Sequence, residues 1–430
     1  MKGHIFYDLM KDIEIPRFVR VTYEMTQGSL DDPYSEVIRQ FKDGGLTAKI
    51  RPGDRVCITV GSREISKIYE ITKAIVDSVK GAGGIPFIIP AMGSHGGATA
   101  EGQRQIVEGW GITEERIGAP IESSMETVKV GTTDSGLDVH IDKCAANADW
   151  IIVAGRIKPH TDFRGEVESG LMKMITIGMG KQRGASICHT RGFPLMSRNV
   201  RDMANVAIAR LPFLCGVGIL ENAAHRTYKI EVVPAEKIDE REPELLLEAK
   251  ALMPRIPFKK AHTLIVDEIG KNISGPGMDP NIVGRSGIIG RWEPNFDAIM
   301  IRDITDESHH NGNGLGVADV TTRRAFDKFS FEMTYPNSIT CIDPVGIKIP
   351  MVMPNDKLAL KYALRVCDPS LENGEKPKVV WIHNTLSMGS FLISESLIED
   401  ARKADELTIV SSAMEIQYDG EDNFAGLKEI

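Results

Sequence analysis

Residues 55–90 read RVCITVGSREISKIYEITKAIVDSVKGAGGIPFIIP, and this stretch decides the fold of the chain. It begins and ends with a short apolar run, at 55–60 and 85–90, which is typical of strands buried in a sheet. Between the runs, apolar residues recur at helical spacing over 64–80, and glycines at 81, 83 and 84 end that helix. A strand, a helix and a strand at this spacing predict a parallel pair joined by a right-handed crossover.

The same alternation continues along the chain. Apolar runs at 150–155, 213–220 and 228–233 predict further strands, and the patterns at 98–110 and 196–211 predict helices. We therefore expect the fold class to be α/β, with a mostly parallel sheet.

A change of composition near residue 254 indicates a domain boundary. Residues 254–260 read PRIPFKK, which is typical of a linker. A second α/β series follows, with strands expected at 263–266, 298–301, 340–343, 379–382 and 407–410 and a helix at 357–365. Because 430 residues are too many for one ordinary core, we predict two α/β domains, residues 1–258 and 259–430. We expect the active site in the cleft between them, and the C-terminal segment is a candidate to pack back on the first domain.

The composition excludes several classes of function. A net charge of −9 argues against a general nucleic-acid-binding protein, which needs a basic surface. The 6 cysteines are scattered without a CxxC pair, so we expect neither a disulfide framework nor a cysteine-based metal site. No segment offers the roughly 18 uninterrupted apolar residues that a membrane span needs. We expect a cytoplasmic protein with no membrane partner.

Candidate functional residues follow the predicted strands, where ligands of open α/β sheets bind. Residues 91–99 read AMGSHGGAT, follow one strand and open a helix, so backbone N–H groups there attract anions. The glycines leave the ring of His95 unobstructed. On the residues alone, the segment is a loop with a functional histidine, a phosphate-binding loop with an incidental histidine, or a tight turn.

Three further residues carry chemistry. His160, in the segment GRIKPHTD at 155–162, is a candidate general base, because the pKa of histidine lies near physiological pH; the alternative is a surface histidine in a turn. Lys173 has apolar neighbours that lower the pKa of an amine and favour covalent attachment; the alternative is a lysine that snorkels to the surface. His189 is a candidate metal ligand, although one histidine alone does not establish a metal site.

The order of these residues resembles the lactate racemase family, whose members use a nickel-pincer nucleotide. The resemblance rests on a strand-end Arg63, Gly-Ser-His95, Pro-His160, Lys173 and His189, and it is close over about residues 10–230. It implies that Lys173 tethers the cofactor and that His189 binds nickel. It also implies that His95 and His160 alternate as acid and base.

The cofactor that the resemblance implies is a pyridinium-3-thioamide-5-thiocarboxylate mononucleotide with nickel, covalently attached to Lys173 and supplied by dedicated synthesis enzymes. Ser62, Arg63, Gly93 and Ser94 are its further expected contacts. The implied reaction inverts C2 of a small 2-hydroxy acid by hydride transfer to and from the cofactor, while the two histidines exchange the hydroxyl proton.

Two departures from the family's pattern concern the substrate. The segment between His160 and Lys173 is a few residues longer than in lactate racemase itself, and the residues 61–63 lack the aspartate that precedes the arginine. We therefore expect a substrate other than lactate, such as a sugar acid. A cation of the second domain is expected to bind the substrate carboxylate, and the sequence offers Lys271 and Arg285 for this contact.

Two other functions stay open. A metal-dependent hydro-lyase that acts on a sugar acid leaves Lys173 unexplained but has candidate carboxylate ligands in Asp162, Glu166 and Glu168. A non-catalytic nucleotide-binding protein needs only the loop at 93–97, and it predicts that the histidines at 160 and 189 are dispensable.

Overall fold

The computed structural model describes residues 5–25, 28–190, 192–258, 260–372 and 374–429. The chain folds as two compact units. The N-terminal unit is Gln27–Met253, and the C-terminal unit combines Met1–Thr26 with Pro254–Ile430. The division at Pro254 coincides with the proline-rich stretch that the sequence indicates as a linker.

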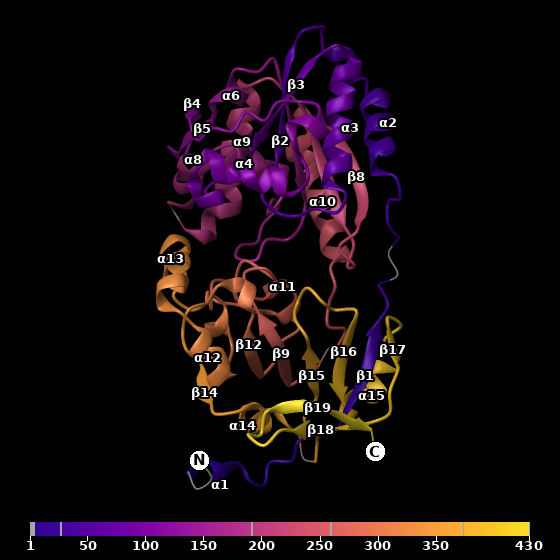
Figure 1. Cartoon of the computed structure of the whole chain (residues 1–430), viewed down its shortest axis with the longest axis vertical. Helices are drawn as coiled ribbons and strands as arrows, with labels where there is room; N and C mark the ends of the chain where they lie inside the picture. Colours follow the sequence, from indigo (N-terminus) through magenta and orange to yellow (C-terminus); the bar gives the residue numbers. More distant parts are fainter. Residues whose placement is uncertain (1–4, 26–27, 191, 259, 373, 430) are drawn as a thin grey trace. The chain divides into compact units, whose positions relative to one another are not determined.

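The N-terminal unit is built on a sheet with the strand order β3-β2-β6-β7-β8 (Figure 1). The first four of these strands pair in parallel, and β8 is antiparallel to β7. Their bounds are β2 (Arg55–Val60), β3 (Ile85–Pro90), β6 (Trp150–Arg156), β7 (Phe213–Glu221) and β8 (Thr227–Pro234). A separate antiparallel hairpin pairs β4 (Thr127–Thr132) with β5 (Asp138–Asp142). The expected α/β fold and its strands are confirmed.

Helices connect these strands. The main ones are α2 (Pro33–Asp43), α3 (Ile68–Gly81), α4 (Ala100–Gly109), α5 (Glu114–Ile117), α6 (Lys143–Ala146), α7 (Leu171–Lys173), α8 (Lys181–His189), α9 (Met196–Arg210) and α10 (Ile238–Leu252). Helix α3 begins later than the apolar spacing predicts. The reason is that Glu221, at the end of β7, accepts the backbone N–H of Ser66 at 2.7 Å and keeps that segment in a loop.

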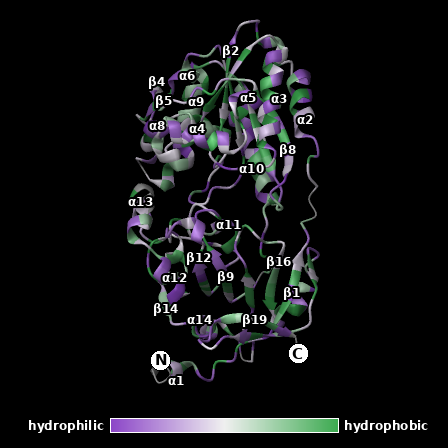
Figure 2. Cartoon of the chain, viewed as in Figure 1, coloured by the Kyte–Doolittle hydropathy of each residue, from purple (hydrophilic) through white to green (hydrophobic). Residues whose placement is uncertain are grey.

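The core of the N-terminal unit lies between β2 and α3. Ile71, Ala74 and Ile75 of α3 are fully buried and belong to the same cluster as Val56 and Ile58 of β2. Figure 2 shows that α3 carries both hydrophobic and hydrophilic residues, as expected for a helix with one buried face. Burying each isoleucine or valine side chain contributes about 1.5–3 kcal/mol. This interface therefore stabilises the sheet whose strand ends carry the loops of the candidate site.

In the described part of the chain, the C-terminal unit has a mixed 10-stranded sheet with the order β14-β13-β12-β9-β15-β16-β1-β18-β19, and β17 pairs with β1 (Figure 1). The strands from β14 to β15 in this order are parallel, and the rest are antiparallel. The bounds are β1 (Phe18–Tyr23), β9 (Thr263–Ile269), β12 (Ala298–Ile304), β13 (Val320–Thr322), β14 (Met351–Met353), β15 (Val379–Ile382), β16 (Ser390–Ser394), β17 (Leu407–Ile409), β18 (Met414–Tyr418) and β19 (Phe424–Glu429).

The remaining elements of this unit are short, apart from two helices. They are α1 (Ile5–Met10), α11 (Pro280–Val283), the strand pair β10 (Arg285–Ser286) and β11 (Gly290–Arg291), α12 (Arg323–Lys328), α13 (Phe331–Cys341), α14 (Asp356–Cys367) and α15 (Ile398–Ala401). No helix among the residues that the structure describes is long and apolar enough to cross a membrane.

Two features of this unit differ from the sequence expectations. The first strand, β1, pairs antiparallel with β16 and β17 of the C-terminal unit, although it lies within the range 1–258. Its buried Phe18 and Val21 complete a core far along the chain, which a local pattern does not reveal. The expected strand at 340–343 is wrong, because its first residues end α13, a helix that begins where the Ser330 hydroxyl accepts the N–H of Met333.

Candidate active site

The candidate residues of the N-terminal unit gather at one edge of its sheet. Ser62 and Arg63 follow β2, His95 follows β3, and His160 follows β6. These three strands are neighbours and run parallel, so their carboxyl ends meet at the same edge. This is the position at which open α/β sheets bind ligands.

The loop after β3 presents His95 to solvent and to the neighbouring loop. The Oγ of Ser62 lies 2.5 Å from His95 Nδ1, so the end of β2 orients the imidazole. Gly96 has a positive φ of 65°, and a Cβ there would lie 2.7 Å from the backbone of Gln103. Glycine is therefore required for this tight approach of the loop to α4. Ser94 is exposed beside His95.

His160 is held by its own loop. Its backbone N–H donates to Glu168 Oε2 at 2.7 Å, and its Nδ1 accepts the N–H of Asp162 at 2.9 Å. The ring stacks on Phe163 with 4.2 Å between ring centroids. Because Nδ1 accepts a hydrogen bond, the neutral ring carries its proton on Nε2.

The surroundings of His160 keep its ring neutral. Burial lowers the pKa of His160 well below its usual value, and the positive charges of Lys173 and Lys158 lower it further. The side chain is 13% exposed. At neutral pH the imidazole is therefore unprotonated, which is the state that a general base requires.

Lys173 lies where a regular helix changes its winding. It ends α7, and the next five residues, Met174–Gly178, form a π-helical turn (η3). Such turns inside helices occur frequently at functional sites. Burial lowers the pKa of Lys173 to about 8, while Asp162 opposes the shift and Lys158 adds to it. The amine is thus far more nucleophilic at neutral pH than that of a surface lysine.

The residue after Lys173 packs directly on the strand ends. A Cβ added at Gly155, in β6, would lie 2.8 Å from Met174 Cγ, and one added at Gly61 would lie 3.5 Å from Met174 Cε. Only a glycine at 155 lets the lysine-bearing turn come this close to the sheet. The end of β6 therefore sets the height of Lys173 above the sheet edge.

His189, the last residue of α8, has one ring nitrogen committed. Its Nδ1–H donates to the carbonyl of Ala185 at 2.7 Å, so the neutral ring presents the lone pair of Nε2. Burial lowers the pKa of His189, which keeps the ring in the neutral form that binds metals. A backbone carbonyl on the other nitrogen is the usual support for a metal-binding histidine.

The structure brings these residues into one neighbourhood. The charge of Lys173 acts on both His160 and His189, and Arg63 acts on Lys173. The His95 loop joins them through the backbone, because the N–H of Gly93 donates to the carbonyl of Gly178 at 3.2 Å. The site is strongly basic, in contrast to the net charge of the chain, and it suits a phosphate or a carboxylate.

Lys271 and Arg285, the two candidate cations of the C-terminal unit, differ in how many of their donors bind other groups of the protein. Arg285 is buried, and its guanidinium donates to Asp319 at 2.5 Å and to the carbonyls of Phe296 and Val317. Lys271 follows β9 and donates from Nζ to the carbonyl of Gly275 at 2.5 Å. Because the guanidinium of Arg285 already donates to three groups within the unit, Lys271 is the better candidate for a substrate carboxylate.

Two buried carboxylates support the site in roles that the sequence does not indicate: the sequence offers Glu168 only as a possible metal ligand, and it does not single out Glu242. Glu168 is fully buried and ties the His160 loop to Lys250, whose Nζ lies 2.7 Å away. Glu242 of α10 accepts the N–H of Met172 at 2.8 Å, at the start of α7. Neither acid belongs to a recognisable motif. Glu242 lies in the charged stretch 239–244, so no local signal marks it as a buried residue.

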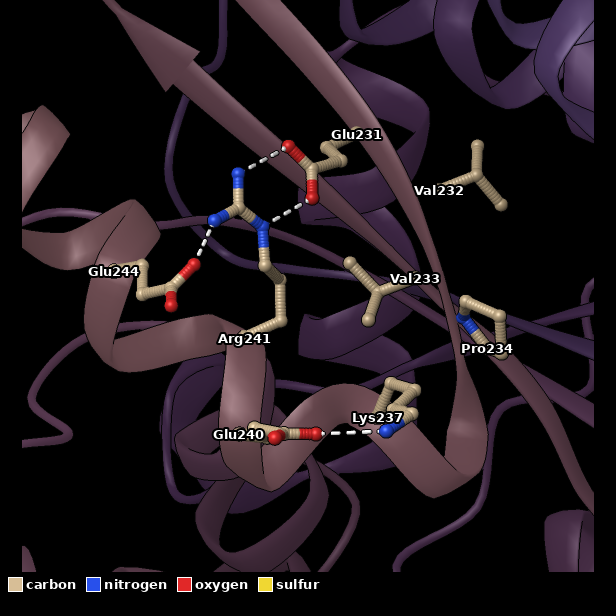
Figure 3. Close-up of a pocket in the computed structure, with 8 residues that line it drawn as sticks. All are labelled: Glu231, Val232, Val233, Pro234, Lys237, Glu240, Arg241 and Glu244. Atoms are coloured by element: carbon tan, nitrogen blue, oxygen red, sulfur yellow. Dashed lines mark hydrogen bonds and ion pairs between the residues drawn. The ribbon is translucent and has the colours of Figure 1, made fainter.

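Two other features do not form a site. Among the residues that the structure describes, no group of three or more His, Cys, Asp or Glu could hold a metal ion. A surface hollow between β8 and α10 is lined by charges that pair with one another, since Arg241 contacts Glu231 and Glu244, and Lys237 contacts Glu240 (Figure 3). This hollow offers a ligand no uncommitted charge among the residues drawn.

Comparison with known proteins supports the resemblance that the sequence suggests. Residues 30–197 match the family model of the lactate racemase N-terminal domain, a range that contains every candidate residue of the N-terminal unit. None of the curated proteins matches the chain in sequence.

Two solved structures match the chain over most of its length. The lactate racemase apoprotein from Thermoanaerobacterium thermosaccharolyticum matches with a TM-score of 0.53 and 14% identity, over 86% of this chain and 99% of that chain. A structural-genomics protein from Thermotoga maritima matches with a TM-score of 0.46 and 11% identity, over 84% and 98% of the two chains. The first match shows a shared α/β architecture that extends across both units.

Proposed function

Because the chain carries the N-terminal domain of the lactate racemase family, we propose that it is a racemase or epimerase that inverts C2 of a 2-hydroxy acid. The observation that carries the proposal is Lys173, a partly buried lysine whose pKa is lowered to about 8 by desolvation and whose charge acts on both His160 and His189. A nucleophilic amine, a neutral base and a neutral metal ligand then lie in one basic site.

The residues present fit a nickel-pincer nucleotide. The Lys173 amine would hold it covalently, and His189 Nε2 would bind its nickel, since Nδ1 is occupied by the carbonyl of Ala185. Arg63, with Ser62, Gly93 and Ser94 beside it at the strand ends, would contact the nucleotide. When bound, the cofactor would take a hydride from C2 of the substrate and return it to the other face.

His95 and His160 are the proposed acid–base pair. His160 is neutral at physiological pH because of burial and nearby cations. In the tautomer that the Asp162 contact favours, its Nε2–H would donate a proton to the substrate oxygen, and the ring would accept the hydroxyl proton in the other tautomer, once Nδ1 has released that contact. His95 stands on the neighbouring strand end with its Nδ1 held by Ser62, which leaves Nε2 to donate to or accept from the other enantiomer. Each histidine is base in one direction and acid in the other.

The substrate carboxylate is assigned to Lys271, which follows β9 of the C-terminal unit. We propose a substrate more polar than lactate, such as a sugar acid. The support for this choice is the longer segment between His160 and Lys173 and the absence of an aspartate before Arg63.

The hydro-lyase alternative finds little support in the carboxylates that it needs. Glu166 is exposed and pairs with Arg201, while Glu168 is fully buried against Lys250 and the His160 backbone. These two oxygen ligands do not converge with Asp162 on one metal site among the described residues. The alternative also leaves Lys173, with its lowered pKa, without a role.

A label at C2 of the substrate separates these functions. Protein made together with the cofactor-synthesis enzymes is incubated with single enantiomers of C2-deuterated hydroxy acids, and the products are separated on a chiral column. The proposal predicts the opposite enantiomer with its deuterium retained, because the hydrogen moves as a hydride. Inversion with loss of the label would contradict the hydride step, and a dehydrated product would support the hydro-lyase instead.

A further inference from the structure

A chain of buried polar groups lies beneath the loop that carries His95. Asp142, Lys181 and Gln103 are each fully buried. Lys181 Nζ lies 3.0 Å from Asp142 Oδ2 and donates to Gln103 Oε1 at 3.2 Å and to the carbonyl of Pro90. Two of these contacts are hydrogen bonds, and the contact with Asp142 is an ion pair.

Gln103 passes this connection to the histidine loop. Its amide Nε2 donates to the carbonyl of Gly93 at 2.9 Å and to that of His95 at 3.2 Å. The amide oxygen of the same side chain accepts from Lys181. The orientation of Gln103 is therefore fixed by the lysine, and the backbone on both sides of Ser94 is fixed by Gln103.

Lys181 also begins the helix that ends at His189. It is the first residue of α8 and has a φ of 54°. Residues other than glycine, asparagine and aspartate rarely adopt this left-handed backbone conformation. A buried ion pair adds little to stability over apolar side chains of similar size. Strain and charge burial at one residue indicate a role other than packing.

We propose that Lys181 is a positioning residue that joins the His95 loop to the His189 helix and so fixes the distance between the acid–base group and the metal ligand. That the distance between His95 and His189 matters for catalysis rests on the proposed function. The connection itself runs from Asp142 through Lys181 and Gln103 to His95, and it can be tested without cofactor.

The test compares three proteins by amide hydrogen exchange and by ¹⁵N NMR of histidine. Gln103→Met cuts the connection to the loop alone. The double variant Lys181→Met/Asp142→Asn removes both charges together, so that no unpaired charge stays buried and the protein can fold. Lys129→Met, which breaks an exposed pair with Asp138, is the matched control.

We expect Gln103→Met to raise exchange about tenfold in residues 92–99 and to change the His95 Nδ1 signal, because the contact with Ser62 is lost. Exchange in residues 181–190 stays at the wild-type rate. The double variant raises exchange in both segments, and Lys129→Met in neither.

Two results would overturn the proposal. One is wild-type exchange in both segments of the double variant. The other is a uniform rise across the N-terminal unit that follows a lower melting temperature, as a purely structural role predicts. Nickel retention by the wild-type protein is measured separately, so failure of the proposed function is distinguishable from failure of this inference.

Discussion

At the scale of single residues, the candidate site depends on groups whose protonation is set by burial. Lys173 sits between cations that lower the pKa of its amine and Asp162, which raises it, and burial decides the balance. His160 and His189 are kept neutral by the same cause. Desolvation thus favours the protonation states that the proposed nucleophile, base and metal ligand require.

The first prediction concerns the reactivity of Lys173. With a pKa of about 8, about a tenth of the amine is unprotonated at pH 7, and the fraction rises with pH. Labelling with an amine-reactive reagent, followed by peptide mass spectrometry, should give a rate for Lys173 that reaches half its maximum near pH 8. Exposed Lys129 is the internal control, and its rate should still be rising near pH 10. Parallel profiles for the two lysines would show that Lys173 is not activated.

The second prediction concerns Glu242, which is buried and has a pKa raised to about 7 by desolvation. Its folded pKa exceeds its unfolded value near 4.3, so the native state loses stability as pH rises from about 4.3 to 7. Glu242→Gln keeps an oxygen to accept the N–H of Met172 but carries no charge. We expect it to raise the free energy of unfolding at pH 8 by about 3–4 kcal/mol and to leave it nearly unchanged at pH 4. Urea unfolding at both pH values measures this, and an equal effect at both would refute the assignment.

At the scale of elements, the strands of the N-terminal unit position the site through their ends. The sequence placed β2 and β3 correctly, because continuous apolar runs bounded by glycines are a local signal. It did not predict the π-helical turn after Lys173, because that turn depends on the contact of Met174 with Gly155 across the sheet edge. The late start of α3 has the same kind of cause, a hydrogen bond from Ser66 to distant Glu221.

The third prediction tests the contact that sets the height of Lys173. Gly155→Ala places a methyl group 2.8 Å from Met174 Cγ, so we expect a destabilisation of about 1–3 kcal/mol and slower labelling of Lys173. The double variant Gly155→Ala/Met174→Ala should recover the labelling rate. Gly109→Ala in α4 is the control, because no atom lies within 4 Å of its added Cβ. Failure of the double variant to recover labelling would argue against steric contact as the cause.

At the scale of the whole molecule, the two units differ in whether they are continuous in sequence. The N-terminal unit is one continuous stretch, whereas the sheet of the C-terminal unit needs β1 from the other end of the chain. The composition of residues 254–260 indicates a boundary near Pro254, but no local pattern assigns Phe18–Tyr23 to the C-terminal unit, because pairing between strands hundreds of residues apart leaves no local signal. The burial of Lys181 was not predicted either, because its partners Asp142 and Gln103 lie far from it in the sequence.

The fourth prediction follows from this arrangement. A fragment of residues 28–253 should fold alone and keep the labelling profile of Lys173, because its core and site residues are its own. A fragment of residues 254–430 lacks β1, whose Phe18, Val19 and Val21 are buried, and should not unfold cooperatively. Adding residues 5–25 to it through a flexible linker should restore a cooperative transition. Heat denaturation followed by circular dichroism distinguishes these cases.

The central claim is that Lys173 carries a nickel-bearing nucleotide, and intact-protein mass with nickel content tests it most directly. The wild-type chain and the variants Lys173→Met and Lys129→Met are produced beside the cofactor-synthesis enzymes, which are first shown to load a lactate racemase. The account predicts an added nucleotide-sized mass and about one nickel per chain in the wild type and in Lys129→Met, and neither in Lys173→Met. A wild-type chain of unmodified mass without nickel, or an adduct that survives in Lys173→Met, would contradict it.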